Sequence, residues 1–411
     1  MKTCVIRVLY ISERFCYQLR MTVHDALKPL LSQEIDLKRL PWSCKAMPLR
    51  AIVADETITT PFLTDEAWQT LKSRVKQENL EVILPCCNQP GYLRTSSRGL
   101  AHFVHRTKSD DCTSQPETWQ HLKAKAEVAR ACRDAGWEAV TEASGDGWRA
   151  DILATRGNAQ VAFEVQWSSQ TLEETELRQQ RYAEAGVRCC WLFKSPPNGV
   201  QSRGDIPLFK VEISDEASNV IFNPHEYDRW GYKERYNQTF ELQAFVQLLL
   251  GGNIKFSPDL VARRQQEVLI QFIEIDCWKC KKPYDIYYTS SLFSGCGEDV
   301  DDDLFFHGKV VSEAIKFAQS PQGKHIQMGY IKKRYSKTVS DSYMSFGCPH
   351  CDAICGSFFL HHEIMMDRDS YPIRAVHAFT IDLQEPVSFA QPHWCYSETR
   401  QFCSEQYSKK P

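Results

Sequence analysis

Residues 117–195 alternate between helix-like and strand-like segments, and this alternation constrains the fold more than any other feature of the chain. Helix-like segments repeat apolar residues every three or four positions, whereas strand-like segments alternate apolar and polar residues. Glycines 145, 147 and 157 lie in the expected turns, and Gly186 ends the second helix. The predicted α-β-β-β-α-β order comprises residues 117–135, 137–143, 148–155, 160–168, 171–185 and 187–194.

Two acidic residues stand on consecutive predicted strands of this unit. Asp151 lies in the segment 148–155, and Glu164 shares one face of the segment 160–168 with Gln166 and Ser168. If the two strands pair, the carboxylates lie side by side and repel each other unless a divalent cation, Mg²⁺ or Mn²⁺, lies between them. Such a cation activates water for attack on a phosphodiester, with Gln166 positioning the water or the phosphate.

Both predicted helices carry polar side chains that fit the same chemistry. On the first helix, Glu117, His121 and Lys125 recur every four residues and form one polar stripe. His121 is a candidate proton-transfer group, and Lys125 is a candidate phosphate partner. On the second helix, three side chains are candidates for contact with a nucleic-acid backbone: Arg178, Arg181 and Tyr182.

These motifs together resemble the competence protein CoiA family over roughly residues 80–195. The resemblance implies a PD-(D/E)xK, restriction-endonuclease-like nuclease fold and a role in DNA processing during natural transformation. It assigns the metal-binding roles to Asp151 and Glu164, and it places Gln166 where that superfamily usually has a lysine. The matching motifs are His102-Phe-Val-His105, Cys112, Glu117-x3-His121-x3-Lys125, Trp148-Arg-Ala-Asp151, Phe163-Glu-Val-Gln166-x-Ser168 and Arg178-x3-Tyr182.

Two functions are therefore in competition. The first is a Mg²⁺-dependent deoxyribonuclease that acts in DNA uptake, recombination or related processing, with DNA, recombination or DNA-processing proteins and a second copy of the chain as expected partners. The alternative is a catalytically inactive nuclease fold that binds DNA and recruits partners. Retention of Asp151 and Glu164 favours the enzyme, whereas Gln166 favours the binding module. A thiol-based redox sensor is a third, weaker hypothesis.

Seventeen cysteines are many for a chain expected in the reducing cytoplasm, where clustered cysteines are typical of zinc sites. One candidate zinc site precedes the nuclease-like unit and offers five side chains for four places. Cys87, His105 and Cys112 are the favoured ligands, and Cys86 and His102 compete for the fourth place. The alternative is a buried cysteine pair with surface histidines.

The second candidate zinc site consists of Cys277-Trp-Lys-Cys280 and Cys348-Pro-His-Cys351. Two Cys-x2-Cys pairs predict a four-cysteine structural zinc site, although 67 residues separate the pairs, against about 15–20 in ordinary zinc ribbons. Cys355 is a possible substitute ligand, and Cys132, Cys189 and Cys190 are expected to be packed in a core. Five residues near the pairs suggest DNA contact, although a solvated strand face is the favoured interpretation: Trp278, Lys332, Lys333, Arg334 and Tyr335.

The expected fold class is α/β (α+β), with a restriction-endonuclease-like core and flanking zinc modules, the C-terminal one β-rich and zinc-ribbon-like. No apolar run reaches the roughly 20 residues that cross a bilayer, so a cytoplasmic protein without a membrane partner is expected. A start of translation at Met47 is one hypothesis for the irregular first segment. The predicted regions are an N-terminal extension (1–46), a β-rich Cys/His module (47–116), the nuclease core (117–197), a connecting region with a helix at 240–250 (198–265) and the C-terminal zinc-ribbon-like domain (266–411).

Overall fold

The structure is a computed structural model, and it describes residues 47–106, 112, 117–197, 203–222, 238–300, 304–356, 359–360 and 371–407. The chain divides into two units, Met1–Lys45 and Ala46–Pro411, and every described residue lies in the second unit. The extension 1–46, on which the hypothesis of a start at Met47 depends, lies outside the described residues.

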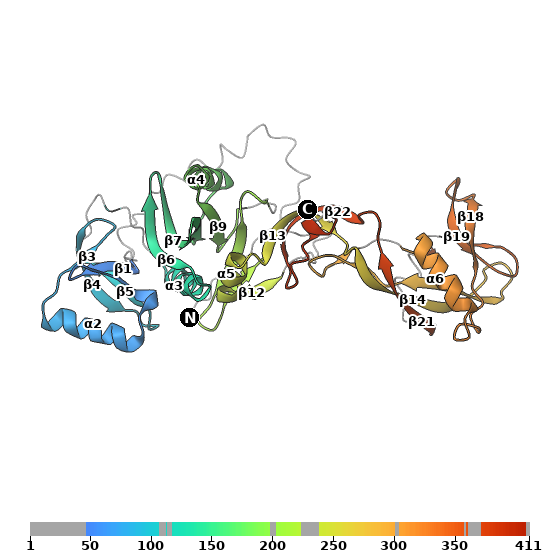
Figure 1. The fold of residues 1–411 in the computed structure, drawn as a ribbon, viewed down its shortest axis with the longest axis horizontal. Helices are drawn as coiled ribbons and strands as arrows, with labels where there is room; N and C mark the ends of the chain where they lie inside the picture. Colours follow the sequence, from blue (N-terminus) through green and yellow to red (C-terminus); the bar gives the residue numbers. More distant parts are fainter. Residues whose placement is uncertain are drawn as a thin grey trace, which may run out of the picture. The chain divides into compact units, whose positions relative to one another are not determined.

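The first described module is a five-stranded sheet of order β2-β1-β3-β4-β5. The helix α2 (Asp65–Gln77) lies beside this sheet, as Figure 1 shows. Thr64 caps this helix by accepting a hydrogen bond from the amide of Ala67. Trp68 of α2 packs edge-on against Phe103 in the core of the module. The strands are β1 (Arg50–Val53), β2 (Glu56–Thr59), β3 (Val82–Leu84), β4 (Gln89–Thr95) and β5 (Ala101–His105), and the 3-10 helix Thr60–Phe62 follows β2.

The second module is a seven-stranded sheet of order β12-β11-β10-β9-β8-β7-β6. β8 and β9 run parallel because a helix connects them, whereas β6, β7 and β8 form antiparallel pairs. The strands are β6 (Glu138–Gly145), β7 (Trp148–Arg156), β8 (Ala159–Gln166), β9 (Arg188–Phe193), β10 (Leu208–Ile213), β11 (Ser218–Ile221) and β12 (Thr239–Glu241).

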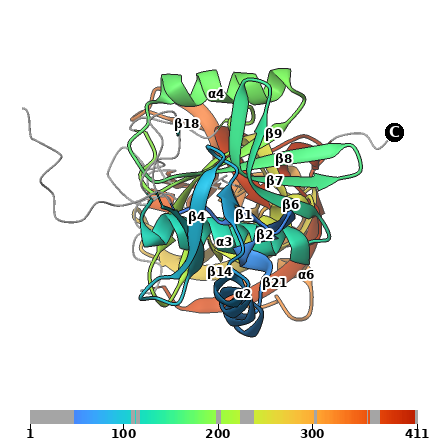
Figure 2. The same ribbon diagram turned by 90° about the vertical axis from the view of Figure 1, so that its left-hand side faces the viewer.

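Helices cover both faces of this sheet. α3 (Trp119–Asp134) and α5 (Leu242–Leu250) pack on one face, where small residues such as Ala124 allow close approach, and α4 (Leu172–Glu184) packs on the other. Figure 2 shows α3 and α4 on opposite sides of the strands. Thr171 and Glu174 form a capping box that fixes the start of α4.

The predicted α-β-β-β-α-β order is observed from α3 to β9, with boundaries displaced by one to a few residues. The predicted connecting region 198–265 needs correction. β10, β11 and β12 extend the same sheet, and the helix expected at 240–250 is α5, which packs beside α3. The short apolar runs of this region complete the apolar layer under α3.

The C-terminal region is rich in β-strands, as predicted, and it has its own apolar core. One sheet has the order β15-β14-β21, a second has the order β18-β19-β20, and β13 pairs with β22. Among the described residues, no helix is long and apolar enough to span a membrane. The elements are β13 (Ile254–Val261), β14 (Gln265–Asp276), β15 (Pro283–Thr289), β16 (Leu292–Phe293), β17 (Asp299–Val300), α6 (Gly308–Gln319), β18 (Tyr330–Ser336), β19 (Asp341–Gly347), β20 (Ile354–Cys355), β21 (Ile373–Asp382), β22 (Ser388–Tyr396) and the 3-10 helix Cys403–Glu405.

Candidate active site and metal centres

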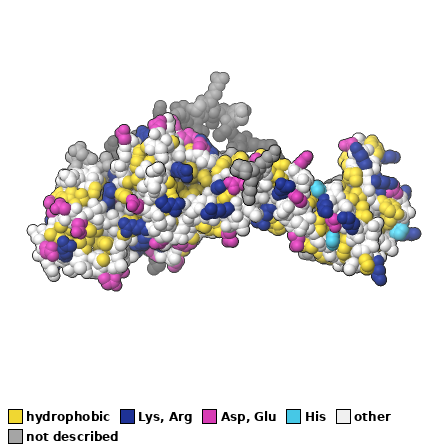
Figure 3. Space-filling model, in the orientation of Figure 1, with side chains coloured by type: hydrophobic (Ala, Val, Ile, Leu, Met, Phe, Trp, Pro, Cys, Tyr) yellow, Lys and Arg dark blue, Asp and Glu magenta, His cyan; other side chains and the backbone are white. Residues whose placement is uncertain are grey.

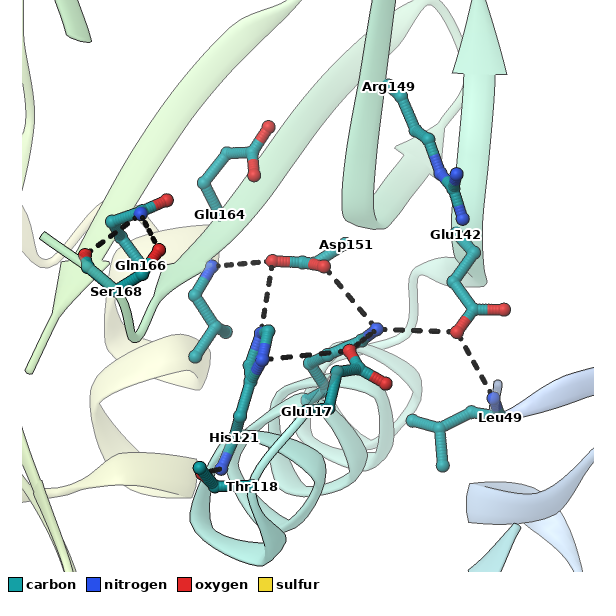
Figure 4. A network of polar contacts seen from close by, with 12 residues as sticks. Leu49, Glu117, Thr118, His121, Glu142, Arg149, Asp151, Glu164, Gln166 and Ser168 are labelled. Carbon is teal, nitrogen blue, oxygen red and sulfur yellow. Dashed lines mark hydrogen bonds and ion pairs between the residues drawn. The ribbon is translucent and has the colours of Figure 1, made fainter. Parts of the chain in front are cut away.

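Asp151 lies where β7 and β8 separate. The regular pairing of these strands ends at Ile152 and Phe163. Beyond this pair, the amide of Val165 donates a hydrogen bond of 2.9 Å to Asp151 Oδ2. Ala150 packs in the core under α4 and Ile152 in the core under α3, although residues two apart on a regular strand share a face. This irregularity turns the carboxylate of Asp151 toward α3 (Figure 4).

Lys125 of α3 holds three carboxylates together from a buried position. Its Nζ lies 2.8 Å from Glu117 Oε1, 3.3 Å from Glu142 Oε1 and 3.4 Å from Asp151 Oδ1, and its side chain is 2% exposed. Burial opposes the charge of Lys125, but the three acids outweigh it and raise its pKa well above the ordinary value. Burial likewise opposes the charge of Asp151, but Lys125 and His121 together lower the pKa of that carboxyl.

His121 lies between two of these acids, one turn before Lys125. Its Nδ1 is 3.6 Å from Glu117 Oε1 and its Nε2 is 3.6 Å from Asp151 Oδ2, and its ring stacks beside Trp167. Nε2 is buried and makes no hydrogen bond within the described part of the chain. Ligand atoms of Glu117, His121 and Asp151 all lie within 4.8 Å of one another, so these residues could hold a metal ion.

Glu164 belongs to a second polar cluster, under α4. Its carboxylate contacts the hydroxyl of Tyr182 and lies 2.6 Å from Arg178 Nη2. Burial, together with the negative charge of Asp151, raises the pKa of Glu164 to about 7, although Arg178 and Tyr182 act in the opposite direction. Gln166 joins this cluster through a weak contact with Arg178, and its amide donates to Ser168.

The structure therefore divides the predicted catalytic residues between two faces of the sheet. Asp151 contacts α3 and Glu164 contacts α4, so the two carboxylates do not converge in the way that simple strand pairing predicts. They remain close enough for the charge of Asp151 to act on Glu164. A single cation shared by Asp151 and Glu164 stays a prediction.

Two expected contacts with the substrate need correction. Lys125 is buried among carboxylates, so its ammonium has acidic partners in place of a phosphate. Tyr182 is 1% exposed, and its hydroxyl donates a 2.7 Å hydrogen bond to the carbonyl oxygen of Arg149, so it is a core residue rather than a nucleic-acid contact.

Sequence reasoning missed Glu142 and Arg149. Glu142 accepts hydrogen bonds from Lys125 and from the amide of Leu49, and it has a left-handed backbone with φ of 54°. An acid at the end of a strand gives no sign of either contact. Arg149 directly follows Trp148 in the motif that contains Asp151, and its position beside the β6–β7 turn is the signal that could have been used.

A basic hollow adjoins Glu164 on the α4 face. It has a volume of about 480 Å³, and its lining includes two glycines of the β6–β7 turn and three arginines from β7 and α4. Arg149 and Arg181 are exposed there, whereas Arg178 also lies over the ring of Trp191 and donates to Gln170. The lining residues are Gly145, Gly147, Trp148, Arg149, Arg178, Arg181 and Tyr182.

Replacement of Lys125 by Met should destabilise this module by about 3–5 kcal/mol, because it leaves buried acids without their cation. Protection of α3 and β7 against hydrogen exchange measures the loss. Lys123→Met is the matched control on the same helix, and its half-buried pair with Glu127 at 3.8 Å predicts a loss of about 1 kcal/mol or less. Equal losses in both variants would show that Lys125 does not hold the acids together.

The N-terminal candidate metal site brings together Cys86, Cys87, His105 and Cys112. Cys86 Sγ lies 3.8 Å from Cys87 Sγ and 3.2 Å from His105 Nε2. The sulfur–sulfur distance fits a tetrahedral zinc site, because zinc–sulfur bonds of about 2.3 Å place two sulfurs about 3.8 Å apart. His102 lies outside this group. It is buried, its Nδ1 contacts the carbonyl of Leu100, and burial lowers its pKa. Of the two side chains that compete for the fourth place, Cys86 and not His102 lies with the other three candidate ligands.

The C-terminal candidate metal site brings together Cys277, Cys280, Cys348 and Cys351 in spite of the long spacing. Sulfur–sulfur distances of 3.6 Å join Cys277 to Cys351 and Cys280 to Cys348, and these distances fit one tetrahedral ion. Cys355 is buried outside this group, and Cys132, Cys189 and Cys190 are buried in the apolar layers of the central sheet.

The basic strand near this site has a structural role in part. Asp352, in the turn after Cys351, accepts hydrogen bonds from Arg334 Nη2 at 2.6 Å and from Lys332 Nζ at 2.7 Å. Arg334 is buried, so for this side chain both interpretations, DNA contact and a solvated strand face, were wrong. Lys333, Tyr335 and Trp278 are exposed, and the indole of Trp278 donates to the carbonyl of Ile354.

Comparison with known protein families gives a match for the central sheet module. Residues 117–212 match the family model described as competence protein CoiA, nuclease-like domain, and the match covers α3 through most of β10. No curated protein matches the chain. The matched segment contains Asp151, Glu164 and every residue that lines the basic hollow. Lys125 and its three acidic partners also lie within it. Residues 117–212 of this chain are therefore similar to the nuclease-like domain of competence protein CoiA.

Proposed function

We propose that residues 117–212, within a restriction-endonuclease-like fold, form a metal-dependent nuclease that cuts DNA phosphodiester bonds. The observation that carries the proposal is the buried Nε2 of His121, which faces Asp151 without a hydrogen bond in the described part of the chain. Its nearest acceptor, Asp151 Oδ2, lies 3.6 Å away, which is long for a hydrogen bond, and a cation held by Glu117, His121 and Asp151 would satisfy the buried nitrogen.

We assign a separate role in the proposed reaction to each polar residue of the site. Glu117, His121 and Asp151 would hold the cation, which is Mn²⁺ or Mg²⁺ because carboxylates dominate the donor set. When bound, such an ion lowers the pKa of water and stabilises charge on the phosphate. Lys125 neutralises the surrounding acids, and Glu164 is the second acid of the site, held by Arg178.

DNA is the proposed substrate, and the basic hollow is its proposed contact. The chain has a net charge of −3, and the face in Figure 3 intersperses acidic and basic side chains, so binding depends on local arginines rather than on a global field. Arg149 and Arg181 would contact phosphates beside Glu164. Cytoplasmic location, DNA-processing partners and a homodimer belong to the same proposal.

The second candidate is a DNA-binding module without catalysis. Three observations favour it: Asp151 has Lys125 as a counter-charge, Glu164 has Arg178, and Gln166 donates to Ser168 instead of supplying the positive charge of a lysine. In this case the acids stabilise the fold, and the arginines bind the backbone of DNA.

Incubation of labelled single- and double-stranded DNA with the purified full chain, with Mg²⁺ or Mn²⁺, separates the two candidates. Cleavage that disappears in both Asp151→Ala and Glu164→Ala supports the nuclease, provided that circular dichroism shows both variants folded. Binding without cleavage in the wild type, unchanged in both variants, supports the binding module.

Replacement of Arg181 by Ala should weaken DNA binding and lower the slope of log K against log salt by about 1, as expected for one lost phosphate contact. Fluorescence anisotropy at several salt concentrations measures both quantities. Arg188→Ala is the matched control, because Arg188 is also exposed but lines a different pocket. An equal effect of the two substitutions would indicate that the hollow is not the contact.

A further inference from the structure

A third group of metal-ligand side chains lies in the C-terminal region, apart from the two cysteine sites above. Ligand atoms of Cys296, His393, Cys395 and Cys403 all lie within 4.8 Å of one another. Cys296 Sγ is 3.6 Å from His393 Nε2 and 3.6 Å from Cys403 Sγ, and the sulfurs of Cys395 and Cys403 are 3.8 Å apart. These distances match the edges of a tetrahedron around zinc, about 3.8 Å between sulfurs.

The surroundings orient the histidine as a ligand. His393 is 1% exposed, and its Nδ1 donates a hydrogen bond of 2.8 Å to the carbonyl oxygen of Gln391. A carbonyl only accepts, so the proton of the neutral ring is on Nδ1, and the lone pair of Nε2 points toward the sulfurs. Metal-bound histidines are commonly held by such a hydrogen bond from their other nitrogen.

The turn that carries Cys296 is shaped for close approach to Cys403. A side chain at Gly295 would lie 2.3 Å from the carbonyl oxygen of Gln401 and 2.8 Å from the amide of Cys403, so only glycine fits against this segment. Gly297, on the other side of Cys296, has a left-handed φ of 89°. The backbone of this turn therefore lets Cys296 approach His393 and Cys403, which are 97 and 107 residues away in the sequence.

We infer that Cys296, His393, Cys395 and Cys403 bind a structural zinc ion. Three thiolates and one imidazole complete a four-coordinate zinc shell and leave no position for a substrate, so the site is structural rather than catalytic. Cys395 and Cys403 are buried and Cys296 is half-buried, as expected for a closed site.

The position of the ligands indicates what the ion stabilises. Side chains alternate along β22. His393 and Cys395 lie on the side of the other two ligands, and Trp394 and Tyr396 lie on the opposite side. The ring centroids of Trp394 and Phe209 of β10 are 5.3 Å apart, and those of Tyr396 and Phe240 of β12 are 4.9 Å apart. The ion thus fixes the strand that closes the apolar layer under the nuclease-like sheet.

Zinc content of the full chain, purified under reducing conditions and dialysed against metal-free buffer, tests the inference. His393→Ala should lose one zinc ion per chain relative to the wild type, whereas His393→Cys should keep it because a thiolate can replace the imidazole. Cys132→Ala, a buried cysteine outside every ligand group, is the matched control and should keep the full content. Unchanged zinc content in His393→Ala would overturn the inference.

Alkylation of the wild type provides a readout that does not depend on how the variants fold. Cys296, Cys395 and Cys403 should resist alkylation until a chelator is added, as judged by mass spectrometry of peptides from the folded protein. In His393→Ala, peptides of β22 should also exchange amide hydrogens faster than in the wild type. Alkylation of all three thiols in folded wild-type protein before chelation, or a disulfide between Cys296 and Cys403, would contradict a metal site.

Discussion

Replacement of Asp151 by Asn should reduce metal-dependent DNA cleavage by about a thousandfold, which corresponds to several kcal/mol of transition-state stabilisation. The oxygens of Asp151 face both His121 Nε2 and Lys125 Nζ, so its charge is central to any cation held here. Asn keeps the shape of the side chain and an oxygen that accepts from the amide of Val165. Initial rates with saturating Mn²⁺ measure the effect.

Glu142→Gln is the control for this substitution. Glu142 also contacts Lys125, at 3.3 Å, but it lies outside the group of Glu117, His121 and Asp151 that could hold an ion. The control should therefore keep cleavage within about tenfold of the wild type while it perturbs Lys125 in a similar way. Equal loss of activity in the two variants would mean that neutralisation of Lys125, not cation binding, determines the rate.

Replacement of Cys280 by Ser should release one zinc ion and lower the melting temperature of the C-terminal region by about 10–20 °C. The large effect is expected because Cys280 and Cys348 come from different sheets, which the ion joins at the ends of β14 and β19. Zinc analysis and calorimetry measure the two quantities. Cys355→Ala is the matched control, since this buried cysteine lies outside the ligand group and should keep the ion.

Zinc analysis and calorimetry, combined with alkylation of the native protein, also test the redox-sensor hypothesis for these cysteines. A structural zinc site predicts stoichiometric metal and no alkylation of Cys277 or Cys280 in the native protein. Full alkylation of both thiols, or a reversible disulfide within the Cys277-x2-Cys280 turn, together with an unchanged melting temperature in Cys280→Ser, would favour the sensor instead.

The core from α3 to β9 was predictable because its signals are local. Apolar periodicity distinguishes helix from strand, and the glycine turns and the capping residue Thr171 give the boundaries. β10 and β11 were missed because short strands resemble any short apolar run, and membership of a sheet depends on distant partners.

The separation of Asp151 from Glu164 was not predictable from alternation. Regular pairing beyond Ile152 and Phe163 would place both carboxylates on one face, as the sequence suggests. The irregular backbone between Ala150 and Ile152, opposite the left-handed Glu142, turns Asp151 to the other face. Departures of this kind depend on three-dimensional packing and leave no periodic trace.

The cysteine groups show the same limit. Cys-x2-Cys pairs were recognisable because both ligands of each turn are adjacent in sequence. The group of Cys296, His393, Cys395 and Cys403 combines a lone cysteine with a His-x-Cys strand and with a cysteine that begins the 3-10 helix after it. The separation of Cys296 from the other three means that only the fold reveals the group.

The most direct test of the account is a crystal structure of the protein soaked with Mn²⁺, with the ion located by its anomalous scattering. The account predicts an anomalous peak in contact with the carboxylate of Asp151 and with His121 Nε2, and loss of that peak in Asp151→Asn. An intact, ordered site that shows no peak at saturating Mn²⁺, with Lys125 still paired to all three acids, would contradict it.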